Sequence, residues 1–180
     1  MRKFIVTEFL TLDGVMEEPA WTAPYWNDEI AKFKYDELFG SDTLLLGRVT
    51  YQGFAAAWPS RTDEQGFADR MNSLPKFVVS TNLQKVEWNN SRLIKENIPE
   101  EVSRLKLQSG QDILVAGSAT LVNTLMEHDL IDEYHLLIYP LVLGSGKPLF
   151  KNRAKPVNLK LLETKKFVTG VVLLSYEAES

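Results

Sequence analysis

Cysteine is absent from this chain of 180 residues, and long apolar runs are absent as well. Without cysteine there is no disulfide, no thiolate nucleophile and no cysteine-ligated metal, a composition typical of a reducing compartment. Glu8 interrupts the first apolar stretch, and no later run approaches the length of a membrane span. We therefore expect a cytoplasmic protein that carries no secretory signal and does not interact with a membrane.

Basic residues are too few and too scattered to suggest a nucleic-acid partner. The chain has 20 Lys and Arg against 24 Asp and Glu, a net charge of −4, and its longest basic run is Lys165-Lys166. The two histidines, His128 and His135, lack the spacing of a metal pair, so we expect no metal site. His135 reads as a strand residue satisfied by a neighbour.

Three common catalytic or nucleotide-binding motifs are also missing. There is no Gly-x-Ser-x-Gly elbow, and hence no candidate hydrolase nucleophile. Neither Gly-x-Gly-x-x-Gly nor a nucleoside-triphosphate loop occurs. What is present is the composition of a folded globular protein, 44% hydrophobic and 24% charged, without internal repeats or linkers. We expect one domain over residues 1–180.

The order of the expected elements predicts an α/β fold. Strands are expected at 3–10, 43–46, 76–80, 91–95, 112–116, 132–143, 157–167 and 170–178. Helices are expected at about 28–39, 51–58, 63–73, 99–110 and 119–128, and 17–26 reads as a loop. Strands alternating with helices, followed by consecutive strands, predict a mixed sheet that is parallel in the middle and antiparallel at its C-terminal edge. Helices should cover both faces.

Three buried strands run into small or hydroxyl-bearing turns. The junctions are Leu46-Gly47-Arg48-Val49-Thr50, Val79-Ser80-Thr81 and Ala116-Gly117-Ser118-Ala119-Thr120. Ligands of open α/β sheets bind beyond the carboxyl ends of the strands, where glycine permits close approach and helix N-termini attract phosphate. Each junction alone is equally consistent with a cap or a tight turn, but together they fit a dinucleotide whose pyrophosphate spans the sheet edge.

Several segments resemble one superfamily. Residues 44–51 resemble the Gly-Arg-x-Thr-Trp/Tyr segment of dihydrofolate reductases, and Thr11-Leu12-Asp13-Gly14 resembles the turn after the first strand of riboflavin-biosynthesis reductases. Residues 130–136 and 140–150 look very like the late strand and glycine loop of that RibD C-terminal domain family. The chain departs from these relatives at the third junction, where Ala116-Gly117 replaces two consecutive glycines.

The resemblance implies a three-layer α/β/α dihydrofolate-reductase-like fold, NADPH as hydride donor and a homodimer. By position in the family, the cofactor-binding residues are Gly14, Gly47, Arg48, Thr50, Ser80, Thr81, Gly117, Ser118, Ala119, Thr120 and Leu121. The Phe33-Lys34 pair resembles the dihydrofolate reductase helix that holds the substrate through an acidic residue, which corresponds to Glu29 here, with Asp28 beside it. Asp13 and Glu29 are the catalytic candidates.

The substrate side leaves alternatives open. The candidates for substrate binding are Trp21, Trp26, Asp28, Gly144 and Lys147, and Tyr25 belongs with the two tryptophans. The aromatic rings would stack on a planar substrate or pack beneath the loop. Acidic residues in a first helical turn also serve as dipole partners. Asp13 would equally complete a tight turn, and Lys147 would equally be a solvated loop charge.

The function implied is an NADPH-dependent reductase resembling 5-amino-6-(5-phosphoribosylamino)uracil reductase, acting on a pyrimidine- or pterin-like heterocycle. The alternatives are a dihydrofolate or pterin reductase, a paralogue with another small heterocyclic substrate, and a non-catalytic dimeric nucleotide-binding protein. Shared fold does not decide among them.

Overall fold

The computed structural model describes residues 1–151 and 155–179, and these form eight strands joined in one sheet. The strands are β1 (Phe4–Leu10), β2 (Ser41–Gly47), β3 (Lys76–Val79), β4 (Ser91–Ile94), β5 (Asp112–Val115), β6 (Glu133–Ile138), β7 (Leu159–Lys166) and β8 (Val172–Ala178). The α-helices are α1 (Asp28–Phe39), α2 (Arg48–Ala57), α3 (Phe67–Ser73), α4 (Ile98–Leu107) and α5 (Ala119–Glu127), and η1 (Pro19–Tyr25) is a 3₁₀ helix.

The sheet is mixed, as the sequence predicts. Its strand order is β4-β3-β2-β5-β1-β6-β8-β7, and the strands from β4 to β6 pair in parallel. β8 runs antiparallel to both of its neighbours at the C-terminal edge. Because β2, β3 and β5 are adjacent and parallel, their carboxyl ends meet at one edge of the sheet.

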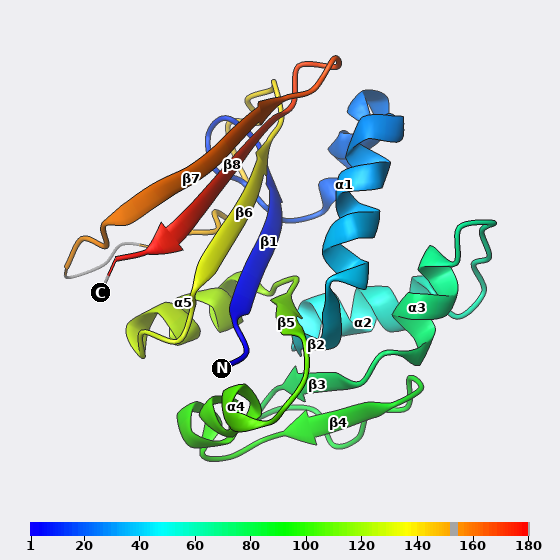
Figure 1. Ribbon diagram of the computed structural model, residues 1–180, viewed down its shortest axis with the longest axis vertical. Helices are drawn as coiled ribbons and strands as arrows, with labels where there is room; N and C mark the ends of the chain where they lie inside the picture. The colour runs from blue at the N-terminus through cyan, green and yellow to red at the C-terminus, as the bar shows by residue number, and fades with distance from the viewer. Residues whose placement is uncertain (152–154, 180) are drawn as a thin grey trace.

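Helices cover both faces and make the three layers visible in Figure 1. The central strand β2 is buried on both sides: Leu45 packs with residues of α4 and α5, whereas Leu44 and Leu46 pack with residues of α1, α2 and α3. A third apolar cluster joins η1 and the first half of α1 to β6 and β8 around Tyr139. The cover ends at β7, most of whose residues are exposed.

Local chemistry accounts for where several elements begin and end. Asn27 caps α1, its side chain accepting a hydrogen bond from the Ile30 N–H at 3.0 Å. α3 begins at Phe67 rather than 63, because the Asp63 carboxylate accepts the N–H groups of Phe67 and Ala68 and caps the helix from the loop. β6 ends at Ile138 instead of 143, because Pro140 has no N–H to continue the ladder.

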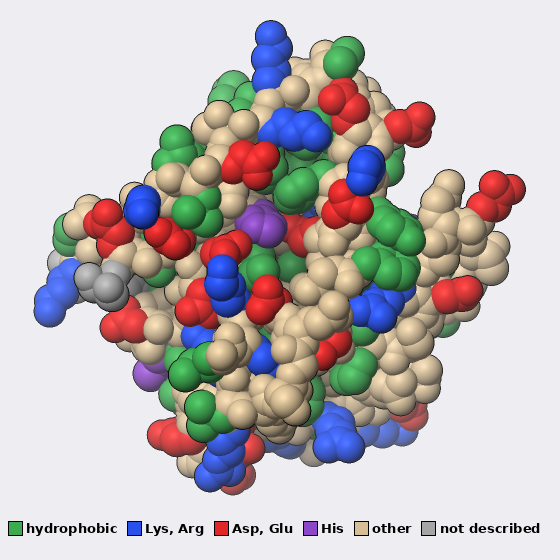
Figure 2. All heavy atoms as spheres, viewed as in Figure 1, with side chains coloured by type: hydrophobic (Ala, Val, Ile, Leu, Met, Phe, Trp, Pro, Cys, Tyr) green, Lys and Arg blue, Asp and Glu red, His purple; other side chains and the backbone are tan. Residues whose placement is uncertain are grey.

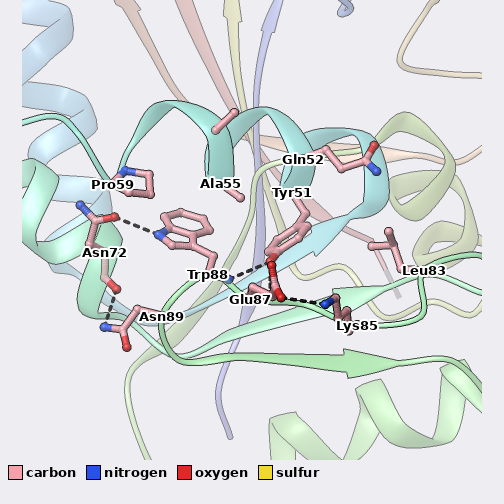
Figure 3. Close-up of a pocket in the computed structure, with 11 residues that line it drawn as sticks. Tyr51, Gln52, Ala55, Pro59, Asn72, Leu83, Lys85, Glu87, Trp88 and Asn89 are labelled. Carbon is pink, nitrogen blue, oxygen red and sulfur yellow. Dashed lines mark hydrogen bonds and ion pairs between the residues drawn. The ribbon is translucent and has the colours of Figure 1, made fainter.

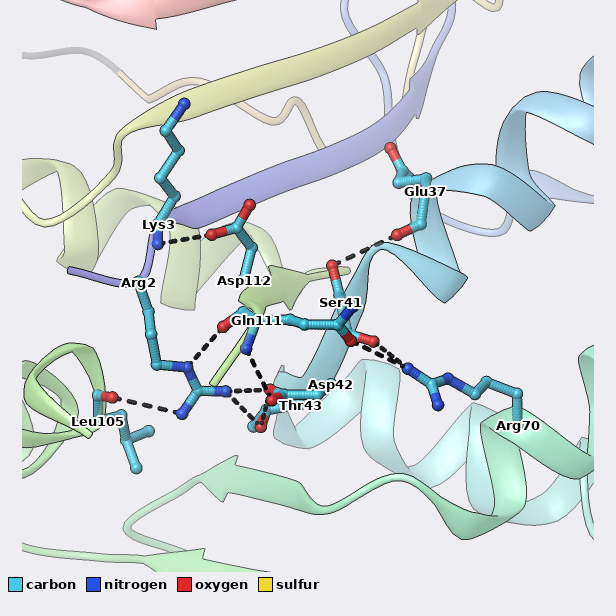
Figure 4. Close-up of polar contacts among 10 residues, drawn as sticks. All are labelled: Arg2, Lys3, Glu37, Ser41, Asp42, Thr43, Arg70, Leu105, Gln111 and Asp112. Carbon is cyan, nitrogen blue, oxygen red and sulfur yellow. Dashed lines mark hydrogen bonds and ion pairs between the residues drawn. The ribbon is translucent and has the colours of Figure 1, made fainter. Parts of the chain in front are cut away.

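A buried arginine connects chain segments at the amino-terminal ends of the central strands. The Arg2 guanidinium donates to the Gln111 carbonyl at 2.6 Å, to Thr43 Oγ1 at 2.8 Å and to the Asp42 carboxylate. These partners belong to β2 and to the segment before β5, as Figure 4 shows. The contact therefore joins three chain segments at the end of the sheet opposite the glycine junctions.

Candidate active site

The three predicted junctions converge at the carboxyl edge of the sheet. The Gly47 N–H donates to the Gly117 carbonyl at 2.8 Å, so the ends of β2 and β5 are in direct contact. A Cβ on Gly47 would collide with Ser118 Oγ, and one on Gly117 would come within 2.6 Å of Thr50 Oγ1. Both glycines are required by close backbone approach, and Gly117 also has a φ of 117°.

A cavity of about 320 Å³ opens where these ends meet. Its wall consists of Arg48, Val49, Val79, Ser80, Thr81, Asn82, Ile98, Ser118, Thr120, Leu121, Thr124 and Lys147. The wall thus combines two cations, hydroxyl and amide groups and a few apolar side chains. Such a set suits a phosphorylated, partly apolar ligand.

Most predicted cofactor residues lie in or directly beneath this wall. Arg48, Ser80, Thr81, Ser118, Thr120 and Leu121 line it. Gly47, Thr50 and Gly117 form the contact between the two strand ends behind it. Ala119 is different, because its side chain is buried in the core. Gly14 lies in the loop after β1, where its carbonyl accepts the Leu149 N–H at 3.1 Å.

The serine hydroxyls are held by the backbone. Ser80 Oγ accepts the N–H groups of Asn82 and Leu83 at 3.1 and 3.2 Å, and Ser118 Oγ accepts the Leu121 N–H at the start of α5. A hydroxyl that accepts in this way keeps its own proton to donate. Both serines are therefore fixed with a donor available for an anion at the edge of the sheet.

Sequence reasoning missed Val49, Asn82, Ile98 and Thr124, which complete the wall. Two of them carried a usable signal: Thr124 lies one helical turn after Thr120, and Ile98, the first residue of α4, directly precedes Pro99. Lys147 lines the same cavity as Arg48. The structure thus groups Lys147 with the predicted cofactor residues rather than with the aromatic substrate candidates.

Asp13 joins the loop after β1 to the loop that contains Gly144. Its carboxylate accepts hydrogen bonds from Thr11 Oγ1 at 2.5 Å, the Gly144 N–H at 2.8 Å and the Leu143 N–H at 3.3 Å. The Thr11 and Gly144 bonds lower the pKa of Asp13. Such a carboxylate stays ionised and is a poor proton donor, so the structure favours the turn-completing interpretation of Asp13 and gives Gly144 a part in the same contact.

The remaining candidates lie on η1, on α1 or between the two, outside the wall of the cavity. The Trp21 ring packs edge-on against the Tyr139 ring, with 5.4 Å between the ring centres. Trp26 is 45% exposed, and its ring centre lies 6.1 Å from that of Phe9. Glu29 accepts the Val168 N–H at 3.1 Å, and Asp28 is exposed in the first turn of α1. Their roles toward a substrate stay predictions.

A buried charged cluster lies between α1 and the sheet. Lys34 Nζ donates to Thr7 Oγ1 at 2.8 Å and to Glu37 at 2.6 Å, and His135 Nδ1 lies 2.6 Å from the other Glu37 oxygen. His135 therefore has the satisfied strand position that the sequence predicts. Although burial opposes it, the nearby Lys34 and His135 lower the pKa of Glu37. On the face shown in Figure 2, acidic and basic side chains are interspersed.

A second cavity, of about 780 Å³, lies between α2, α3 and the β3–β4 connection. Figure 3 shows its frame: Tyr51 Oη accepts the N–H groups of Glu87 and Trp88, and the Trp88 indole donates to Asn72 at 2.9 Å. It shares no lining residue with the cavity at the strand ends.

Comparison with known proteins identifies the family. The pattern of the RibD C-terminal domain matches residues 2–173. The chain belongs to the RibD C-terminal domain family. This reductase-like family agrees with the resemblance seen in the sequence. The uncharacterized protein YyaP of Bacillus subtilis (strain 168) is 34% identical over 178 residues, which cover 97% of this chain and 94% of YyaP.

Two solved structures show that the RibD-type chain has a dihydrofolate-reductase-like fold. A putative riboflavin biosynthesis protein from Shewanella sp. PV-4 has a TM-score of 0.81 at 20% identity and covers 99% of both chains. Dihydrofolate reductase from Enterococcus faecalis, complexed with NADP(H) and RAB-propyl, has a TM-score of 0.67 at 14% identity. The match covers 99% of this chain and 97% of that enzyme. Across residues 1–151 and 155–179, no helix combines the length and apolar character needed to cross a bilayer.

Proposed function

We propose that this member of the RibD C-terminal domain family is an NADPH-dependent reductase that transfers hydride to a pyrimidine- or pterin-like heterocycle. The observation that carries the proposal is the convergence of three parallel strand ends on one cavity whose wall holds Arg48, Lys147 and five hydroxyl side chains. A family of reductase-like proteins, and a structural neighbour complexed with NADP(H), support the same cofactor class.

The residues present fit a phosphorylated dinucleotide. Gly47 and Gly117 leave space where a Cβ would meet Ser118 or Thr50, so backbone can approach a ligand closely. The N-terminus of α5, capped by Ser118, offers unpaired N–H groups to a pyrophosphate. Arg48 is suited to a terminal phosphate, because a guanidinium can donate two parallel hydrogen bonds.

When bound, NADPH supplies the hydride, and the protein's contribution is placement and electrostatics. Arg48 and Lys147 would bind its phosphates, the hydroxyls of Ser80 and Ser118 would fix their position, and the N-terminus of α5 would stabilise their charge. These groups would thereby orient the dinucleotide at the carboxyl edge of the sheet. Orientation of this kind lowers the entropic part of the barrier.

The test measures binding first and turnover second. Intrinsic tryptophan fluorescence is followed during titration with NADPH, NADP⁺ and NADH, and NADPH absorbance is then followed with dihydrofolate and with 5-amino-6-(5-phosphoribosylamino)uracil. We expect NADPH to bind and one substrate class to be reduced. Absence of any dinucleotide binding would refute the proposal. Binding without turnover on either compound would favour the non-catalytic nucleotide-binding alternative or a different heterocycle.

A further inference from the structure

Glu8 lies in β1 just beyond the residues that pair with β5. The two strands pair through Phe4↔Ile113, Ile5↔Leu114 and Val6↔Val115, and β1 then continues alone with β6, Glu8 facing Leu136. Extending the β1–β5 register by two residues sets Glu8 opposite Gly117. The side-chain positions agree, because Glu8 Oε1 lies 3.2 Å from where a Cβ on Gly117 would be. Glu8 is thus next to the third glycine junction.

One oxygen of the Glu8 carboxyl is buried without a hydrogen-bond partner. The residue is 7% exposed, and no described residue gives Oε1 a hydrogen-bond partner. A buried polar group without a partner costs free energy, and such groups collect at functional sites. Gly117 is followed directly by Ser118, which lines the cavity, so the Glu8 carboxyl is next to the residue that precedes this part of the wall.

The surroundings keep this carboxyl protonated. Burial raises the pKa of Glu8 to about 8, Lys34 lowers it in part, and Glu37 raises it again. These charged groups come from α1, and Glu37 is itself bound by His135 of β6. The other groups around Gly117, toward which Glu8 Oε1 is directed, are neutral, namely Thr50 Oγ1 and the Met16 methyl group. A neutral carboxylic acid is a hydrogen-bond donor.

The other two carboxylates considered for this role are occupied. Asp13 is held by Thr11, Leu143 and Gly144, and Glu29 accepts the Val168 N–H at the β7–β8 turn. Hydride transfer to a C=N or C=O bond needs a proton for the heteroatom as well as two electrons for the carbon. Among these three acids, Glu8 is the one that has both a proton to give and a position beside the cofactor junctions.

We propose that Glu8 is the catalytic acid of the reduction, donating its carboxyl proton to the heteroatom next to the carbon that receives hydride. This inference rests on the proposed function. The carbon–heteroatom double bond becomes a single bond, the dihydronicotinamide is oxidised to nicotinamide, and the Glu8 O–H bond breaks to leave a carboxylate. Solvent protonates that carboxylate before the next turnover.

The proposal has a binding signature that does not depend on turnover. The oxidised nicotinamide ring carries a positive charge and the reduced ring does not. Ionisation of a neighbouring Glu8 should therefore favour NADP⁺ over NADPH. We expect the ratio of NADP⁺ to NADPH affinity to rise about tenfold as the pH passes through about 8, which corresponds to a coupling of about one pKa unit.

The experiment compares the wild-type protein with Glu8→Gln, Glu8→Asp and a matched exposed control, Glu163→Gln on β7. Affinities for both nucleotides are measured by fluorescence across this pH range, and single-turnover hydride transfer is followed with the accepted substrate. We expect Glu8→Gln to bind NADPH, to show a flat affinity ratio and to transfer hydride about 10²–10⁴-fold more slowly. Glu8→Asp should retain part of the pH dependence, and Glu163→Gln should match the wild type.

The outcomes separate the two proposals. A wild-type protein that binds neither nucleotide would overturn the proposed function, and the role of Glu8 with it. A wild-type protein that binds both with an affinity ratio unchanged through this pH range would overturn the role of Glu8 alone. So would a Glu8→Gln variant that transfers hydride at the wild-type rate with the wild-type pH profile.

Discussion

Arg48, in the first turn of α2, is exposed on the wall of the cavity, where its Nη1 donates to Gln52 Oε1 at 3.2 Å. We expect Arg48→Ala to weaken NADPH binding about 10–100-fold and NADH binding less than about threefold, since a hydrogen bond to a charged group contributes ~1.5–3 kcal/mol. Fluorescence titration of both nucleotides measures the difference. Arg92→Ala, an exposed arginine of β4 outside the cavity wall, is the control. Equal weakening of NADPH and NADH would contradict a phosphate-reading role.

Glu8 should also make stability depend on pH. Its pKa is about 8 in the folded protein and close to 4.5 when unfolded, so between these values the folded state holds a proton that the unfolded state has lost. The contribution of Glu8 to the free energy of unfolding should therefore be highest below about pH 4.5. It should fall by a few kcal/mol toward pH 8, at about 1.4 kcal/mol per pH unit.

Urea denaturation at several pH values measures this dependence. The decline should be absent from Glu8→Gln and present in Glu163→Gln. A wild-type protein whose stability falls no more steeply between these pH values than that of Glu8→Gln would show that the carboxyl is already ionised in the folded state.

At the scale of elements, Lys76 of β3 joins α3 to the β3–β4 connection. Its ammonium group donates to the carbonyls of Asn72, Leu74 and Asn89 at 2.8–2.9 Å and lies 4.1 Å from the centre of the Trp88 ring. We expect Lys76→Met to lower the free energy of unfolding by ~2–4 kcal/mol, because it leaves buried carbonyls without a donor. The exposed Lys166→Met on β7 should change it by less than about 0.5 kcal/mol in the same denaturation experiment. A loss no larger than that of Lys166→Met would mean that water replaces the ammonium.

β7 is the element expected to carry the predicted homodimer. It forms one edge of the sheet, and Leu161 and Leu162 are 50% and 45% exposed. An edge strand with exposed leucines is a pairing surface. We expect sedimentation of the wild-type protein to give a dimer and Leu161→Lys/Leu162→Lys to give a folded monomer. A wild-type monomer at all concentrations would contradict this arrangement.

The sequence predicts elements better than it predicts contacts between them. The triplet Leu44-Leu45-Leu46 predicts a doubly buried strand, and the mixed sheet follows from the order of elements, because these signals are local. The proposed role of Glu8 depends on where the pairing between β1 and β5 ends. The hydrogen bonds of Asp13 depend on Gly144, which is far along the chain. Contacts of this kind arise from tertiary register, so a single sequence shows the residue and hides its partner.

At the scale of the whole molecule, Arg2 connects the start of β1 to β2 and to the segment before β5 (Figure 4). Its side chain is 5% exposed, and Asp42 is its ionic partner. We expect Arg2→Met to cost ~2–4 kcal/mol of unfolding free energy, because it removes the Asp42 ion pair and takes the donor from the Gln111 carbonyl and Thr43 Oγ1, while Asp42 keeps the Gln111 N–H. Lys3→Met, which removes a pair whose lysine is 53% exposed, should cost at most ~1 kcal/mol. Similar losses in urea denaturation for the two variants would show that the buried position adds nothing.

The hydrogen bonds of Asp13 belong to a longer set of contacts between the loop after β1 and residues 141–148. Val15 bridges to Pro148, the Met16 N–H donates to the Lys147 carbonyl at 3.0 Å, and the Leu12 N–H donates to the Leu141 carbonyl at 2.9 Å. Two loops that are 130 residues apart in the chain are therefore joined to each other by several hydrogen bonds. A ligand that enters or leaves on this side must either move both loops together or leave both in place and displace the opposite wall of the cavity. A cross-link between the loops would then leave turnover unchanged.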